Sequence, residues 1–127
     1  MTARLHRLSN GLTVAVEPMS GLETTAVGLY IDVGARSEAA EKSGLAHMVE
    51  HMVFKGAGSR DAKAIAEDIE DVGGSLNAWT ARDHTVFHAR IMPADMALSI
   101  DMIADLVRAP WFDAAELERE KQVVLAE

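Results

Sequence analysis

Two histidines and a glutamate lie within five residues, His47-Met48-Val49-Glu50-His51, and have the types and spacing of a metal site. Residues four apart project from the same face of an α-helix, so His47 and His51 can direct one nitrogen each at a common point. A catalytic zinc ion takes three protein ligands and a water. Glu50 lies on the flank of that face, where its carboxylate can reach the water as a base. The motif therefore supplies two ligands and a base, and a third ligand must come from elsewhere.

The residues around this motif predict the helix that it needs. Gly44 precedes the motif and Gly56 follows it, which suits a helix between two backbone breaks. On the side away from the histidines, five residues at helical spacing are expected to pack inward: Leu45, Met48, Val49, Met52 and Val53. The alternative is coincidence, in which the histidines are ordinary core or surface residues.

A second helix is predicted from Ala114 to the end of the sequence, after a capping pattern that begins at Asp113. One face of this helix carries Leu117, Glu120, Val124 and Glu127. A glutamate on a buried helix face is costly unless a positive charge meets it, and a zinc ion supplies that charge. The alternative is a solvated acidic stripe, because Glu116 and Glu118 are close by.

The sequence resembles the inverzincin metallopeptidases, the family of pitrilysin, insulin-degrading enzyme and the mitochondrial processing peptidase β subunit. Four blocks agree with that family in order and spacing: Leu8–Leu12, Gly44–Gly56, Leu76–Thr80 and Glu118–Glu127. The likeness covers essentially the whole chain and is nearest to the processing-peptidase branch. Trp79 and Ala57 depart from the residues usual in the family, and neither stands at a ligand position.

The resemblance implies a role for each residue of the site. His47 and His51 are implied to bind zinc, and Glu50 to activate the water. Glu127 is implied to be the third zinc ligand, at the family's spacing after His51. Glu120 matches a second acidic position, which supports the site without binding the metal.

A predicted strand at residues 75–80 is implied to bind the substrate. An exposed edge strand offers unpaired N–H and C=O groups, to which an extended peptide can add. The resemblance places Asn77 and Ala78 on the edge where relatives lay the substrate peptide. From the residues alone, the favoured interpretation of Asn77 is an ordinary strand or turn residue.

The implied function is a zinc-dependent endopeptidase that cleaves extended peptides or presequence-like segments with metal-activated water. This chain by itself is expected to be an inactive or weakly active fragment of that longer enzyme. Two alternatives stay open: a non-catalytic partner subunit, whose relatives typically lack the histidine motif, and a structural metal-binding domain, in which Glu50 is incidental. The formal net charge of -8 argues against binding to nucleic acid or to an anionic membrane and favours a substrate with basic residues.

The composition also sets expectations about the compartment. The sequence contains no cysteine, which excludes a disulfide framework and a thiol nucleophile. No apolar run approaches the roughly 20 residues that span a bilayer. Residues 1–7 lack an apolar signal core, so the expected location is the cytoplasm.

The expected fold class is α+β, with a mostly antiparallel sheet backed by helices. Strands are predicted at 13–17, 25–33, 75–80 and 85–91, and helices at 43–55, 62–72, 94–107 and 114–127. Residues 1–127 are expected to form a single, truncated N-terminal zinc-peptidase domain. The missing part is the C-terminal half of the same enzyme, and the exposed edge and apolar faces favour a homodimer or a domain-swapped oligomer.

Overall fold

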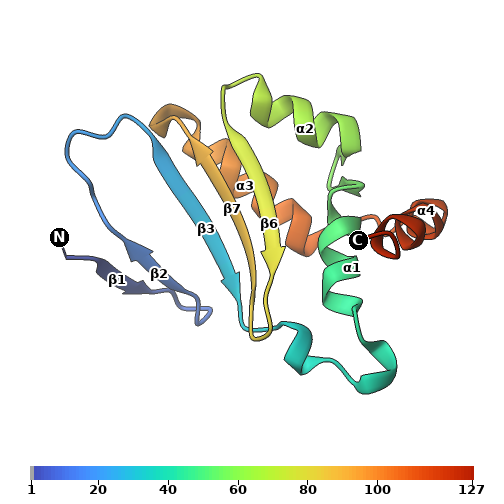
Figure 1. Ribbon diagram of the computed structural model, residues 1–127. Coiled ribbons are helices and arrows are strands. Elements are labelled where there is room, and N and C mark those ends of the chain that lie inside the picture. Colours follow the sequence, from blue (N-terminus) through green and yellow to red (C-terminus); the bar gives the residue numbers. More distant parts are fainter. Residues whose placement is uncertain (1) are drawn as a thin grey trace.

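The structure is a computed structural model that describes residues 2–127, so Met1 of the expected domain lies outside the described residues. Its helices are α1 (Leu45–Val53), α2 (Ala62–Glu70), α3 (Met96–Arg108) and α4 (Ala114–Val124), with 3₁₀ turns at Ala35–Ser37, Ala40–Lys42 and Pro93–Asp95. Its strands are β1 (Arg4–Arg7), β2 (Thr13–Val16), β3 (Thr25–Ile31), β4 (Gly56–Ala57), β5 (Arg60–Asp61), β6 (Ser75–Thr80) and β7 (Thr85–Ile91). All the strand pairs are antiparallel and helices pack on the central sheet, which confirms the α+β class (Figure 1).

The central sheet has the strand order β3–β7–β6, with α3 behind it in Figure 1. Alternate residues of β7 face α3 and are buried, among them Phe87, Ala89 and Ile91. Met102 and Leu106, four residues apart on α3, are buried in the same core. This packing fixes β7 in the middle of the sheet and leaves β6 as an edge strand beside α1.

The predicted bounds agree with the structure best in this sheet. The strands expected at 75–80 and 85–91 are β6 and β7 residue for residue. The other strands, and the helices expected at 43–55, 62–72 and 94–107, differ from the structure by one or two residues at their ends. Strand β1 and the short β4–β5 hairpin were not predicted.

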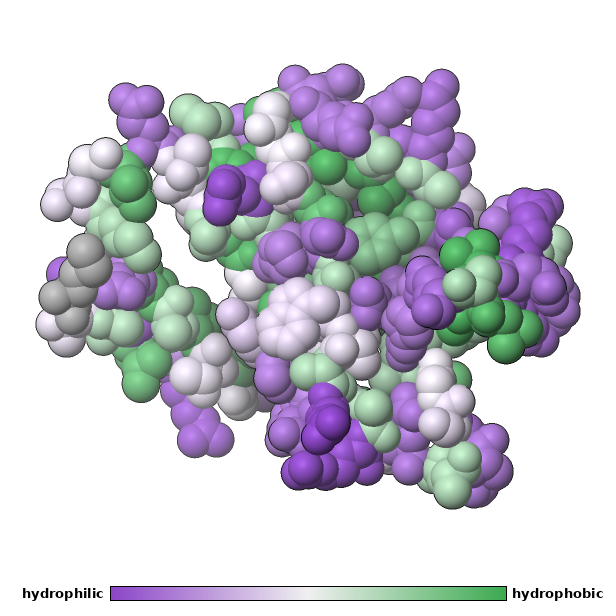
Figure 2. Space-filling model, in the orientation of Figure 1, coloured by the Kyte–Doolittle hydropathy of each residue, from purple (hydrophilic) through white to green (hydrophobic). Residues whose placement is uncertain are grey.

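The β1–β2 hairpin stands apart from the central sheet, to which residues 17–24 connect it (Figures 1 and 2). Its tight turn uses Gly11 at φ 90°, and the Asn10 side chain accepts a hydrogen bond from the Leu12 amide. Leu5, in the middle of β1, is 71% exposed. The hairpin therefore has no part in positioning the predicted site. Within residues 2–127, no helix combines the length and the apolar character needed to cross a membrane.

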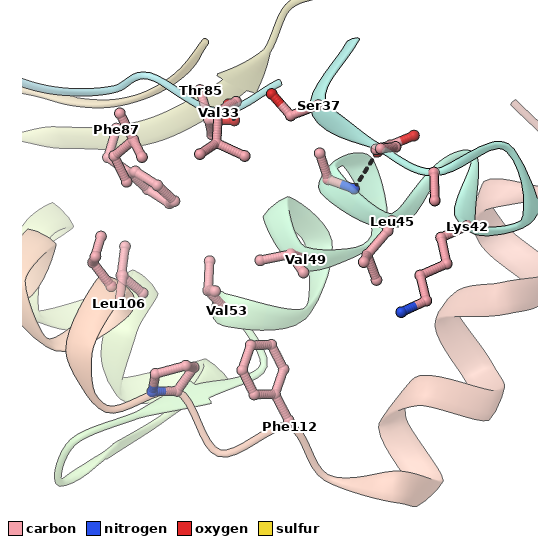
Figure 3. Close-up of a pocket in the computed structure, with 16 residues that line it drawn as sticks. Val33, Ser37, Lys42, Leu45, Val49, Val53, Thr85, Phe87, Leu106 and Phe112 are labelled. Atoms are coloured by element: carbon pink, nitrogen blue, oxygen red, sulfur yellow. Dashed lines mark hydrogen bonds between the residues drawn. The ribbon is translucent and has the colours of Figure 1, made fainter. Parts of the chain in front are cut away.

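An apolar cavity of about 590 Å³ lies behind α1, between this helix, the sheet and the end of α3 (Figure 3). Val49 and Val53 line it from α1, opposite Phe87 and Leu106. Of the five α1 residues expected to pack inward, Met52 and Val53 are buried, but Leu45 is half exposed. The prediction was wrong for Leu45 because the core at the start of α1 is this open cavity instead of a filled interior.

Candidate metal centre

Two features define the start of helix α1. Gly44 has the left-handed φ of 91°, which a glycine adopts without a steric penalty. The Glu38 carboxylate accepts hydrogen bonds from the backbone amides of Gly44 (2.8 Å) and Ala46 (2.7 Å). A carboxylate is also favoured near the positive end of a helix dipole. The start of the helix that carries the histidine motif is thereby fixed from outside.

The structure brings His47, His51 and Glu127 together. The Nε2 atoms of the two histidines are 3.0 Å apart. One carboxylate oxygen of Glu127, Oε2, lies 3.3 Å from the Nε2 of His47 and 3.6 Å from that of His51. These three residues can offer ligand atoms that all lie within 4.8 Å of one another. Three electron-pair donors thus converge on one point, two from α1 and one from the segment that follows α4.

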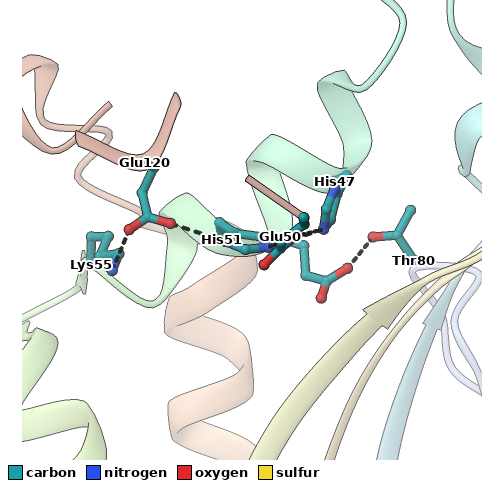
Figure 4. A network of polar contacts seen from close by, with 7 residues as sticks. His47, Glu50, His51, Lys55, Thr80 and Glu120 are labelled. Atoms are coloured by element: carbon teal, nitrogen blue, oxygen red, sulfur yellow. Dashed lines mark hydrogen bonds and ion pairs between the residues drawn. The ribbon is translucent and has the colours of Figure 1, made fainter. Parts of the chain in front are cut away.

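Glu120 holds His51 from the other side of its ring. Its Oε2 lies 2.9 Å from the Nδ1 of His51, and its Oε1 lies 2.6 Å from the Nζ of Lys55 (Figure 4). Glu120 is only 5% exposed, and the hydrogen bond from Lys55 holds its pKa below the ordinary value although burial acts the other way. An ionised carboxylate only accepts, so Nδ1 of His51 carries the proton and Nε2 is free to bind a metal.

The donor set fits a tetrahedral metal ion. Ligand atoms at tetrahedral zinc distances of about 2.0–2.1 Å are about 3.3 Å apart. The three separations here, 3.0, 3.3 and 3.6 Å, lie around that value. Two imidazole nitrogens and a carboxylate oxygen are ligands that zinc accepts, and three of them leave a fourth position open.

Glu127 reaches the histidines from beyond the end of α4. The helix predicted to run to residue 127 ends at Val124, and a turn carries the chain on to Glu127. The Glu127 side chain is 48% exposed, whereas Glu120 is buried. The two glutamates therefore do not share the buried helix face that the pattern predicted, because the last turn leaves the α-helical path before Glu127.

Glu50 stands beside the donor cluster without belonging to it. Its Oε2 accepts a hydrogen bond from the hydroxyl of Thr80, at the end of β6, with a distance of 2.5 Å (Figure 4). Neither Thr80 nor Lys55 was predicted to belong to the site. Lys55 lies four residues after His51, just past the end of α1, and the helix predicted at 43–55 would have placed it on the same face as His51. The alternation of β6 could have placed Thr80 on the same face as Ala78.

The backbone of β6 presents alternate residues to its free edge. The Ala81 amide donates a hydrogen bond to the His84 carbonyl, so Ala81 and His84 form a hydrogen-bonded pair. Thr80 and Thr85 are the next pair in the same register. Backbone groups of an antiparallel pair alternate in direction, so those of Leu76, Ala78 and Thr80 point away from β7. Among the described residues, no strand pairs with that edge.

Asn77 and Ala78 therefore lie on a strand edge that no other described strand covers, with Asn77 exposed and Ala78 buried. The side-chain oxygen of Asn77 accepts a hydrogen bond from the Ala78 amide at 2.8 Å. This amide is one of those that the alternation directs outward. Glu50 lies between the donor cluster of His47, His51 and Glu127 and the edge strand β6 (Figure 4). The Thr80 hydroxyl links its carboxylate to that strand.

A family model described as insulinase, peptidase family M16, matches residues 13–127. This range contains every residue of the candidate site. The chain belongs to peptidase family M16. The resemblance to the processing-peptidase branch is also confirmed, because several similar M16 proteins are named as processing-peptidase β subunits.

The M16 relatives are similar over nearly all of this chain. A probable mitochondrial-processing peptidase subunit beta of Arabidopsis thaliana is 40% identical over 98% of this chain and 23% of its own length. The mitochondrial-processing peptidase subunit beta of Bos taurus is 42% identical over 98% of this chain and 25% of its own length. An uncharacterized zinc protease of Rickettsia felis is 37% identical over 97% of this chain and 30% of its own length. The crystal structure of a Helicobacter pylori protease matches with a TM-score of 0.90 and 30% identity, over 97% of this chain and 30% of that one. The chain thus spans about a quarter of the length of these curated relatives.

Proposed function

We propose that this chain carries the zinc ligands and the catalytic base of a zinc-dependent endopeptidase, as the N-terminal part of a longer enzyme. The observation that carries the proposal is the convergence of His47, His51 and Glu127 beside a separate carboxylate, Glu50. Relatives named as peptidases and zinc proteases support the metal and the reaction class. Their greater length supports the assignment to one part of an enzyme.

The arrangement favours a catalytic over a structural metal. Structural zinc sites are closed by four protein ligands, whereas catalytic sites keep one position for water or substrate. This site offers three donors among the described residues. Glu50 is directed to Thr80 instead of to the shared point of the donors, which suits a base that acts beside the metal.

Each residue then has a separate task in peptide hydrolysis. Zinc, when bound, supplies Lewis acidity that activates water and polarises a carbonyl. Glu50 takes a proton from the attacking water on its carboxylate and delivers that proton to the leaving amine. Glu120 keeps the proton of His51 on Nδ1, so that Nε2 remains a ligand. Glu127 completes the ligand set from the end of α4.

The substrate is an extended peptide that adds to the free edge of β6. Asn77 and Ala78 lie on the strand where that peptide pairs, and main-chain hydrogen bonds give sequence-tolerant binding. The formal net charge of -8 favours peptides with basic residues, including presequence-like segments.

The test is the substitution Glu50→Gln in the full-length enzyme, because it removes the base and keeps the shape of the side chain. We expect zinc content to stay at the wild-type level and peptidase turnover to fall about a hundredfold or more, the usual range for a general base. Glu118→Gln on the exposed side of α4 is the matched control and should leave both unchanged. Near-normal turnover of Glu50→Gln would remove Glu50 from the base role.

A further inference from the structure

The Glu50 carboxylate has one side-chain partner among residues 2–127, the Thr80 hydroxyl. The O–H···O distance of 2.5 Å is at the short end of the range for hydrogen bonds that a hydroxyl donates. This bond occupies Oε2 and leaves Oε1 as the oxygen available to accept a proton. It also fixes the rotation of a side chain that would otherwise move freely beside the cluster.

Thr80 belongs to the substrate strand as well. It is the last residue of β6, and its N–H and C=O point to the free edge by the alternation established from Ala81 and His84. Its side chain, on the same face as Ala78, reaches α1. One residue thus contacts the base through its hydroxyl and offers its backbone to a pairing peptide.

We propose that Thr80 is a positioning residue that orients Glu50 relative to a peptide paired on β6. The hydroxyl holds Oε2 and directs Oε1 toward the water, while the backbone of the same residue sets the register of the peptide. The distance between the base and the scissile bond is therefore defined through a single residue. This inference rests on the proposed function, since it assigns a task within the same site.

Thr80→Val tests the proposal in the full-length enzyme, because valine keeps the shape and β-branching of threonine and removes the hydroxyl. We expect kcat on a short peptide to fall about tenfold to a hundredfold, with KM within about twofold, since misplacement of a catalytic group affects turnover more than binding. Thr80→Ser restores the hydroxyl and should bring kcat to within about threefold of wild type.

Thr85→Val is the matched control. Thr85 faces Thr80 across the β6–β7 pair, but its hydroxyl donates to the Val33 carbonyl (2.8 Å) and not to the base. This variant should keep kcat within about twofold of wild type, because the hydrogen bond that it removes joins two neutral groups and does not involve the Glu50 carboxylate. Zinc affinity, measured by competition with a chromophoric chelator, should equal that of wild type in all three variants.

Several results would overturn the proposal: wild-type kcat in Thr80→Val, no recovery in Thr80→Ser, an equal loss in Thr85→Val, or weaker zinc binding in Thr80→Val. The last result would mean that Thr80 only supports the metal site. A wild-type enzyme that binds zinc and cleaves no peptide would overturn the proposed function, and this inference with it. An active wild type with an equally active Thr80→Val would overturn this inference alone.

Discussion

Helix α1 has two faces that are held in different ways. On the polar face, each functional side chain has a defined partner: Glu120 for His51, and Thr80 for Glu50. On the opposite face, Val49 and Val53 line an apolar cavity and make only non-directional apolar contacts (Figure 3). Within the nine residues of α1, the side chains oriented by hydrogen-bonding partners and those that pack on apolar groups therefore lie on different faces.

This difference teaches that the chemistry and the stability of the helix should respond to different substitutions. Hydrogen-bonded partners set the direction of a nitrogen or an oxygen, and their loss misplaces a ligand or a base. Buried apolar groups contribute through the area that they remove from water, and their loss lowers the free energy of unfolding. Substitutions on the two faces can test whether the separation is real.

The largest expected effect is that of His47→Ala on the polar face. Removal of a ligand should weaken zinc binding by roughly a hundredfold or more, beyond the usual 10–100-fold for loss of a supporting group. Zinc content after dialysis, with peptidase activity, measures the effect in the full-length enzyme. His6→Ala on the exposed β1 strand is the control. Full zinc retention in His47→Ala would exclude His47 from the ligand set.

Glu120→Gln should have the next largest effect. The amide keeps the size of the side chain but loses the charge that meets Lys55 and orients His51. We expect zinc affinity to fall about tenfold to a hundredfold, as for other supporting carboxylates. Chelator competition measures this value, with Glu118→Gln as the matched control. Unchanged affinity would show that Nδ1 of His51 needs no charged acceptor.

Val53→Ala tests the apolar face. Val53 is 2% exposed, so loss of two methyl groups should lower the free energy of unfolding by about 2 kcal/mol and leave zinc affinity unchanged. Urea denaturation and chelator competition measure the two quantities. Val123→Ala, at an exposed position of α4, should change neither. A drop in zinc affinity with Val53→Ala would show that the two faces are coupled.

Leu45→Ala should have the smallest effect. Leu45 lines the cavity but is half exposed, so its truncation should cost within about 0.5 kcal/mol of unfolding free energy. The same urea experiment measures it. A loss several times larger would mean that Leu45 is covered in the full-length protein, and that the cavity is filled there by another part of the polypeptide.

Local pattern was enough to predict the central strands and the histidine helix. The periodicity of apolar residues is recognisable within a few residues in both elements, as a strand period from Thr85 to Ile91 and as a helical period from Leu45 to Val53. Strand β1 escaped prediction because its sequence, Arg-Leu-His-Arg, has a single apolar residue and buries none. The β4–β5 hairpin depends on Pro110 and Trp111, which pair with Ala57 and Gly58 from about 50 positions away.

The sequence indicated which residues form the candidate site, but not the hydrogen bonds and ion pairs that hold them. The motif predicted two ligands and a base in His47, His51 and Glu50, and the helix pattern together with the resemblance pointed to Glu127 as the third ligand. The structure brings His47, His51 and Glu127 together. The bonds from Thr80 to Glu50 and from Lys55 to Glu120 depend on how β6 and α4 pack beside α1. No local period encodes such packing. The expectations of a cytoplasmic location and of self-association stay predictions.

The hydrogen bond between the Asn77 side chain and the Ala78 amide has a consequence for how β6 meets other chains. A bare strand edge recruits any extended segment, including a second copy of itself, and natural proteins guard against this. Here one outward donor is already satisfied by its own neighbour. If a peptide pairs with β6 as proposed, its carbonyl must displace the Asn77 oxygen at this amide, so we expect this position to add little to affinity. Binding would then depend on the outward backbone groups on either side of Ala78, those of Leu76 and Thr80.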